Sequence, residues 1–247
     1  MTNPTPRSTV LSSPKTNLAQ HIRDYGIVVG GRRVLYGMGC AWIGKLPETE
    51  ARATLEAAYA AGYRYFDTSA VYGNSERWLG GFLETIDRSN VFLASKSPVK
   101  GDSPEAVADC IRTSLERSLQ RLKTDRIDLL QLHDVQSLKN VLADGGGVKA
   151  LRQARTDGGI GHYGVATRFH VILEQATQLG GFETILTFSD YTPIDDAAKL
   201  VIALAKRRGL SVINASPLAN GLLTGGDPRQ TRACHLSPAR CERALRF

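Results

Sequence analysis

The sequence predicts an α/β fold, a (β/α)8 barrel of the TIM type that is incomplete and holds about seven βα units. Short strand-like runs rich in β-branched and aromatic residues alternate with helical patterns from residue 34 onward. Successive runs begin about thirty residues apart, the length of one βαβ unit. Strands that alternate with helices are typical of a parallel sheet covered by helices. Seven such repeats favour a barrel over a doubly wound sheet, and no glycine fingerprint follows the first strand.

Seven segments are the expected strands. In chain order they are VLYGMG (34–39), YRYFDT (63–68), VFLASK (91–96), IDLLQLH (127–133), YGVAT (163–167), TILTFSDY (184–191) and LSVINASP (210–217). The segment GIGHYG (159–164) satisfies a dinucleotide-binding pattern literally, but it follows a helix and leads into a strand. We therefore expect a tight turn there and not a phosphate site.

The helices between these strands carry their own start and stop signals. Pro47 begins a helix over 48–61, and Gly62 ends it. Ser103 with Pro104 begins a longer helix, and Asp195 begins another that closes on a cationic turn at 206–208 before Gly209. Two apolar stripes mark the buried faces of the first two helices, namely Ala51, Leu55, Ala58, Tyr59 and Val107, Ile111, Leu115, Leu119, Leu122.

The chain divides into three expected parts. Residues 1–23 are rich in Ser, Thr, Pro and Asn and are expected to be a mobile tail, and residues 24–228 form the barrel. Residues 229–247 show neither strand alternation nor a clear helical stripe. We expect this atypical tail to replace the last barrel unit, so that the barrel is truncated at its C-terminus and has two unpaired edges.

Composition narrows the function classes. The 247 residues carry a formal net charge of +7, but five arginines lie within the last nineteen residues and no basic stripe interleaved with aromatics occurs elsewhere. No apolar stretch approaches the ~20 residues that a membrane span needs. We expect a soluble, cytoplasmic protein without nucleic-acid or membrane partners, although a basic nucleic-acid binder stays open as a minor alternative. The four cysteines lack zinc spacing, so we expect free thiols and no metal, including at Cys234 and His235.

Polar residues recur where the expected strands end. Period-2 alternation makes Asp67, Lys96 and His133 the last inward residues of consecutive strands, and Tyr72 follows in a βα loop. Active sites of such barrels lie at this rim. A lysine in the barrel mouth needs an anion, which Asp67 supplies, and the charged lysine should lower the pKa of Tyr72 for proton transfer. His133 would orient a substrate oxygen; alternatively, these groups are only a structural ion pair and a core histidine.

Five segments resemble the aldo/keto reductase superfamily over about residues 30–228. They are FDTSAVYGNSE (66–76), ASK (94–96), LQLHD (130–134), GVAT (164–167) and ASPLANGLLT (215–224). The resemblance implies that Tyr72 is the general acid/base, that Lys96 and Asp67 tune it, and that His133 positions a carbonyl. It also implies a nicotinamide cofactor, NADP or NAD. Ala215, in place of a tyrosine that many relatives carry, makes the chain most similar to the sugar-oxidising branch around L-galactose and D-threo-aldose dehydrogenases.

The resemblance also implies where the cofactor binds. It places Ala166 and Thr167 near the carboxamide, with Thr167 in place of the usual asparagine, and Ser216, Leu218 and Asn220 along the pyrophosphate. Residues that follow the first strand lie at the same rim and are further candidates: Gly39, Cys40 and Ala41 for the cofactor, beside Asp67, and Trp42 for the substrate, beside Tyr72 and His133. The relatives' residues that hold the adenosine ribose have no counterpart in 229–247.

These observations predict an oxidoreductase that transfers a hydride between NADP or NAD and a small carbonyl or alcohol, an aldose or an aldehyde. The alternative is a truncated, noncatalytic barrel that binds the cofactor weakly or not at all and serves as an inactive homologue or a partner subunit. The sequence leaves the substrate, the direction of the reaction and the oligomeric state open.

Overall fold

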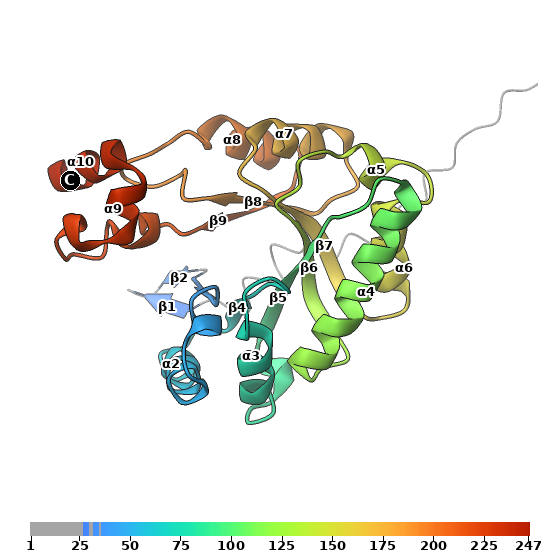
Figure 1. Cartoon of the computed structure of the whole chain (residues 1–247), viewed down its shortest axis with the longest axis horizontal. Coiled ribbons are helices and arrows are strands. Elements are labelled where there is room, and N and C mark those ends of the chain that lie inside the picture. The colour runs from blue at the N-terminus through green and yellow to red at the C-terminus, as the bar shows by residue number, and fades with distance from the viewer. Residues whose placement is uncertain (1–26, 30–31, 35) are drawn as a thin grey trace, which may run out of the picture.

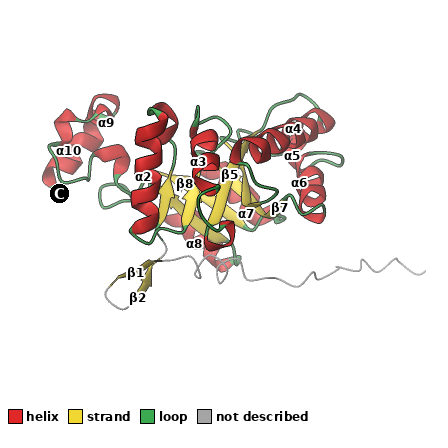
Figure 2. Ribbon diagram, turned by 90° about the horizontal axis from the view of Figure 1, so that it is seen from below, coloured by secondary structure: helices red, strands yellow, loops and turns green. Residues whose placement is uncertain are grey.

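The computed structural model describes residues 27–29, 32–34 and 36–247, so the tail expected over 1–23 lies outside the described residues. Seven parallel strands form one sheet in the order β3-β4-β5-β6-β7-β8-β9, with helices around it (Figures 1 and 2). The strands are β3 (Gly37–Gly39), β4 (Tyr65–Asp67), β5 (Phe92–Pro98), β6 (Ile127–His133), β7 (Ile160–Ala166), β8 (Thr184–Phe188) and β9 (Ser211–Ala215). The predicted seven-unit barrel is confirmed.

The helices follow the strands in the predicted alternation. The longer ones are α2 (Glu48–Ala60), α3 (Ser75–Leu83), α4 (Pro104–Leu122), α6 (Gly147–Thr156), α7 (His170–Leu179) and α8 (Lys199–Arg207). Short elements complete them: η1 (Ile43–Lys45), η2 (Arg88–Asn90), α5 (Lys139–Leu142), η3 (Ala219–Gly221) and η4 (Pro228–Gln230). The Ser103 hydroxyl accepts a hydrogen bond from the Ala106 amide, as expected of the residue that caps α4.

The sheet has an apolar layer on each face. Side chains that point outward from the strands, such as Phe66, Leu93 and Leu130, pack under the helices in the main core. The inward side chains of three neighbouring strands, β4, β5 and β6, form a separate cluster of Tyr65, Phe92, Ala94 and Leu129, against which Ile213 of β9 packs. This inner cluster matches the faces predicted from period-2 alternation, and it forms the floor beneath the C-terminal rim.

The sheet ends at β3 and β9, and among the described residues these two strands do not pair with each other. All five residues of β9 are partly exposed, in contrast to the buried residues of β5 and β6. Both observations agree with the two unpaired edges expected of an incomplete barrel.

Several local expectations are wrong. Strand β7 begins at Ile160, so the turn is confined to Gly158 and Gly159, of which Gly158 has a φ of 82°. Helix α8 begins at Lys199 and not at Asp195, whose carbonyl and carboxylate instead form a turn with Thr192 and Ala197. Two further strands, β1 (Ile27–Val29) and β2 (Arg32–Val34), pair antiparallel and were not expected from the sequence.

The segment 229–247 is helical, contrary to expectation, in α9 (Arg232–Leu236) and α10 (Pro238–Arg246), which Figure 1 shows at one side of the sheet. Cys241 and Ala244 bury against Ala219, Leu222 and Ile194. Two apolar residues per short helix are too few to give a recognisable stripe. Cys234 and Cys241 are joined by a disulfide, so the expectation of four free thiols is wrong, because the helical hairpin brings these two together.

No helix of the described residues is long and apolar enough to cross a membrane. Several of the terminal arginines are committed to ion pairs: Arg229 with Asp227, and Arg240 and Arg243 with Asp195. This leaves less free positive charge on the C-terminal segment than the sequence indicates.

Gly80 on α3 packs closely against the C-terminal end of α4, whereas the neighbouring Gly81 does not. A Cβ at Gly80 would lie 2.2 Å from the Arg121 carbonyl oxygen, whereas one at Gly81 would meet only an Arg52 side-chain nitrogen at 3.9 Å. Gly80→Ala should therefore lower the free energy of unfolding by about 1–3 kcal/mol. Gly81→Ala should leave it unchanged or raise it by about 0.5–1 kcal/mol, because alanine favours the helix. Urea unfolding of the two variants checks this, and equal effects would contradict the close packing.

Candidate active site

The C-terminal ends of β4, β5 and β6 bring the predicted polar residues to one rim. Asp67 lies beside Ala94 in register, and Lys96 lies beside Gln131. Because neighbouring residues of a parallel sheet point to the same face, Asp67, Lys96 and Gln131 stand directly above the inner cluster. His133 ends β6 one step higher. The rim thus collects charged and polar side chains over an apolar floor.

Lys96 and Asp67 form a buried ion pair at the centre of the rim. The lysine is 2% exposed, and its Nζ contacts Asp67 Oδ1 and donates to the Thr68 carbonyl oxygen at 2.8 Å. Burial disfavours the charged amine, but the attraction of Asp67 and Tyr72 outweighs burial and raises the pKa of Lys96 above its ordinary value. Lys96 is therefore a permanent cation at neutral pH.

The loop after β4 carries Tyr72 and is held in place by hydrogen bonds and by close packing against η1. The Tyr72 amide donates to the Ser69 carbonyl oxygen at 3.1 Å, and the Ser75 hydroxyl donates to the Cys40 carbonyl oxygen at 2.8 Å. A Cβ at Gly44 would lie 1.8 Å from the Tyr72 carbonyl oxygen, so only glycine lets the loop approach η1 this closely.

Tyr72 lies between the buried cation and the imidazole. Lys96 Nζ is 5.1 Å from the centroid of the Tyr72 ring, and the rings of Tyr72 and His133 meet edge to face with centroids 5.6 Å apart. Burial raises the pKa of Tyr72, and Lys96 lowers it without cancelling the effect of burial. The net direction is upward, so the expected lowering of this pKa is wrong in sum, although the contribution of Lys96 has the expected sign. The phenol is a proton donor at neutral pH.

His133 is held as a neutral imidazole. Its Nδ1 lies 3.3 Å from the Ser69 hydroxyl oxygen. Burial and the charge of Lys96 lower the pKa of His133, and this outweighs the opposite effect of Asp134 and Asp67. A neutral imidazole with one nitrogen engaged by a hydroxyl can offer the other to a ligand.

Gln131 belongs to this arrangement and was not singled out from the sequence. Its side chain is fully buried, and its Nε2 donates to Asp67 Oδ2 at 3.4 Å. Its Oε1 is one of the buried polar atoms for which the described residues offer no hydrogen-bond partner. The period-2 alternation already placed Gln131 on the inward face. A polar amide at an inward position is the sequence feature that could have identified it as a site residue. Gln131 steadies the carboxylate that pairs with Lys96.

The cofactor candidates after the first strand divide into buried and exposed positions. Cys40 is fully buried in the main core, and its thiol donates to the Met38 carbonyl oxygen. Burial raises the pKa of this thiol far above its usual range. Trp42 is 59% exposed, with Lys45 Nζ 4.4 Å from the centroid of its ring. Gly39 and Ala41 retain exposed surface.

The cofactor candidates on β7 are buried, and those after β9 are exposed. Ala166 and Thr167 are buried, and the Thr167 hydroxyl donates to the Val135 carbonyl oxygen at 3.0 Å, so its side chain is already satisfied. Ser216, Leu218 and Asn220 lie on an exposed loop, in which the Ser216 hydroxyl donates to Asn220 Oδ1 at 2.9 Å. Both residues have positive φ, near 56°.

The inward side chains of β7, β8 and β9 show whether a nicotinamide ring would fit the mouth of the barrel. Ala166, Leu186 and Phe188 face inward there, and Phe188 pairs in register with Ala215. Small or flat apolar groups on this side, opposite Lys96 and Tyr72, fit a planar ring better than they fit a charged or bulky group. In the described part of the chain, no group of three or more His, Cys, Asp or Glu residues could hold a metal ion.

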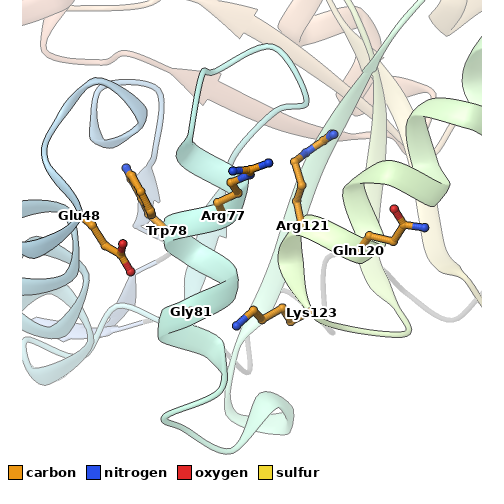
Figure 3. A pocket seen from close by; sticks show the side chains of 7 residues that line it. All are labelled: Glu48, Arg77, Trp78, Gly81, Gln120, Arg121 and Lys123. Atoms are coloured by element: carbon orange, nitrogen blue, oxygen red, sulfur yellow. The ribbon is translucent and has the colours of Figure 1, made fainter.

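Two shallow cavities lie outside the rim, between the outer helices. One has a volume of about 450 Å³ and is shown in Figure 3, lined by Glu48, Arg77, Trp78, Gly81, Gln120, Arg121 and Lys123. Its cations Arg121 and Lys123 pair with Glu76 and Glu84. The second, of about 440 Å³, lies between α4 and α6. Neither cavity is lined by Asp67, Tyr72 or Lys96, so neither belongs to the candidate site at the rim.

The chain is similar in sequence to known proteins over most of its length. A family model described as the aldo/keto reductase family matches residues 33–244. An L-galactose dehydrogenase from Arabidopsis thaliana is 31% identical over 194 residues, which are 75% of this chain and 60% of that protein. A D-threo-aldose 1-dehydrogenase from a Pseudomonas species is 31% identical over 225 residues, 78% of this chain and 68% of that protein.

Solved structures agree with these matches. The holo form of the aldo-keto reductase AKR11C1 from Bacillus halodurans superposes with a TM-score of 0.67 at 27% identity, covering 79% of this chain and 66% of that one. The chain thus spans about two thirds of the length of the relatives that it matches.

Proposed function

The chain belongs to the aldo/keto reductase family, and on that premise we propose that it is an oxidoreductase that transfers a hydride between a nicotinamide cofactor, NADP or NAD, and a small carbonyl or alcohol. The observation that carries the proposal is the buried Lys96–Asp67 pair beneath Tyr72 and His133 at one rim. The two relatives named as sugar dehydrogenases support an aldose as the substrate.

Each side chain has a distinct part in the proposed reaction. When bound, the cofactor supplies or accepts the hydride, which no side chain can do. Tyr72 Oη donates a proton to the carbonyl oxygen during reduction, and the adjacent Lys96 stabilises the phenolate that forms. His133 donates a hydrogen bond to the same carbonyl oxygen and orients it. Asp67, held by Gln131, keeps Lys96 charged.

The cofactor would lie across the mouth in this proposal. Ala166, Phe188 and Ala215 would face the nicotinamide ring, and the loop of Ser216, Leu218 and Asn220 would follow the pyrophosphate. Thr167 contributes less than the sequence analysis expected, because its hydroxyl is already bonded to Val135. As expected from the sequence, we propose a small carbonyl compound or a sugar as the substrate and the cytoplasm as the location. The Cys234–Cys241 disulfide does not support that location, since such bonds are rare in the cytosol.

The test combines turnover with binding. Near-ultraviolet absorbance of NADPH and NADH should fall with a panel of aldehydes, and that of NADP and NAD should rise with a panel of aldoses. The fluorescence of NADPH, titrated with the protein, measures cofactor binding without turnover. We expect saturable binding and turnover of at least one substrate class. The absence of both cofactor binding and turnover would overturn the proposal. That result would favour the alternative, a noncatalytic barrel with unpaired edges at β3 and β9.

A further inference from the structure

Arg168 stands at the mouth next to His133. Ala166, the last residue of β7, pairs in register with His133, so both side chains point inward. Arg168 follows two residues after the end of β7, and it is exposed. Burial and Lys96 dominate the lowering of the His133 pKa, and Arg168 adds to it, which agrees with a guanidinium close to the imidazole.

An aromatic ring holds Arg168 in this position. The guanidinium carbon lies 4.9 Å from the centroid of the Phe188 ring, a cation–π contact. Phe188 ends β8 and pairs in register with Ala215, one of the proposed cofactor residues. The guanidinium is therefore fixed over the mouth while its hydrogen-bond donors stay accessible to solvent.

The charge of Arg168 has no partner among the residues that the structure describes: no carboxylate lies within 4.0 Å of it. Lys96 is paired with Asp67, and His170 Nε2 lies 2.6 Å from Asp190 Oδ2. Asp134 has no ion pair among the described residues, and it raises the pKa of both Tyr72 and His133, so its negative charge lies near both rings.

We propose that Arg168 binds an anionic group of the substrate, and that the preferred substrates are aldoses or aldehydes that carry a carboxylate or a phosphate at the end remote from the reacting carbon. The proposal rests on the proposed function and deepens it. With the reacting carbonyl at Tyr72 and His133, an anionic group at the remote end of the substrate would meet the guanidinium over the Phe188 ring. Arginine suits this role, because its planar donors match both carboxylate and phosphate oxygens in pairs.

The test compares substrates that differ only in the remote group: D-galactose, D-galacturonate and D-galactose 6-phosphate. We expect Arg168→Gln to raise the KM for the anionic substrates roughly tenfold to a hundredfold, the effect of losing a charge-assisted hydrogen bond. It should change the KM for galactose less than twofold and leave kcat nearly unchanged. Arg168→Lys should restore part of the loss. Whichever of galacturonate and galactose 6-phosphate shows the larger increase in KM in Arg168→Gln identifies the preferred anionic group, carboxylate or phosphate.

The matched control is Arg117→Gln, the same change at an exposed arginine on the outer surface of α4. It should alter neither KM. Calorimetric titration of wild type and Arg168→Gln with the same three sugars keeps the proposal testable if no turnover occurs, because selective loss of galacturonate or galactose 6-phosphate binding supports it even then. Equal effects on charged and uncharged sugars, or a loss confined to NADPH binding, would overturn it.

Discussion

Replacing Tyr72 by phenylalanine should lower kcat for carbonyl reduction by about 10²–10⁴-fold, the usual contribution of a positioned general acid. The substitution removes only the hydroxyl. The ring would keep its edge-to-face contact with His133, and the backbone bonds that hold the loop to Ser69 and Ser75 are untouched. KM should change little, because the hydroxyl acts mainly on the transition state. Steady-state rates with an aldehyde and NADPH measure the effect.

The pH dependence of kcat gives a second readout of the same residue. The pKa of Tyr72 is raised, chiefly by burial, so the phenol donates its proton across the neutral range. The rate of reduction should fall only when the pH rises through that elevated pKa. Tyr72→Phe should remove this alkaline limb together with most of the rate.

A tyrosine away from the site provides the control. Tyr36 is half exposed, and Tyr36→Phe should leave both the rate and its pH dependence unchanged. The thermal unfolding midpoint of Tyr72→Phe should also match that of wild type. A Tyr72→Phe variant that retains more than about a tenth of the wild-type kcat would exclude the general-acid role.

Strand positions and inward faces followed from the sequence, because they depend on a local period. The alternation of YRYFDT, FLASK and IDLLQLH placed Tyr65, Ala94 and Leu129 on one face, and these side chains meet in the inner cluster. The same alternation brought Asp67, Lys96 and His133 to one rim. Period and spacing were sufficient here because neighbouring parallel strands keep a fixed register.

The features that sequence reasoning missed depend on how segments pack against one another, which a local period does not contain. The balance of burial against charge that sets the pKa of Tyr72 depends on how the loop packs on Gly44, which no local pattern contains. The bond between Cys234 and Cys241 depends on the turn between α9 and α10. Helix α10 is held by burial of Cys241 and Ala244 against residues of the β9 loop and by ion pairs to Asp195, and its own sequence is mostly polar.

Replacing Lys96 by methionine should have the largest effect on stability in this protein. The change leaves Asp67 without its cation at a site where water has little access, with only the 3.4 Å contact to Gln131 and no other cation bonded to it among the described residues. Removing one partner of a buried ion pair typically costs about 3–5 kcal/mol. Urea unfolding at neutral pH measures the loss. Turnover should fall as well, because Tyr72 would lose the cation that stabilises its phenolate.

Two further variants separate the buried charge from the change in side-chain shape. Lys123→Met makes the same substitution in an exposed pair with Glu84, where both side chains are about half exposed, and should cost less than about 1 kcal/mol. The double variant Asp67→Asn with Lys96→Met leaves no unpaired charge and should recover much of the lost stability without recovering turnover. Equal losses for Lys96→Met and Lys123→Met would show that the Lys96–Asp67 pair is solvated. In that case water would screen the Lys96 cation, and its influence on Tyr72 would be weak.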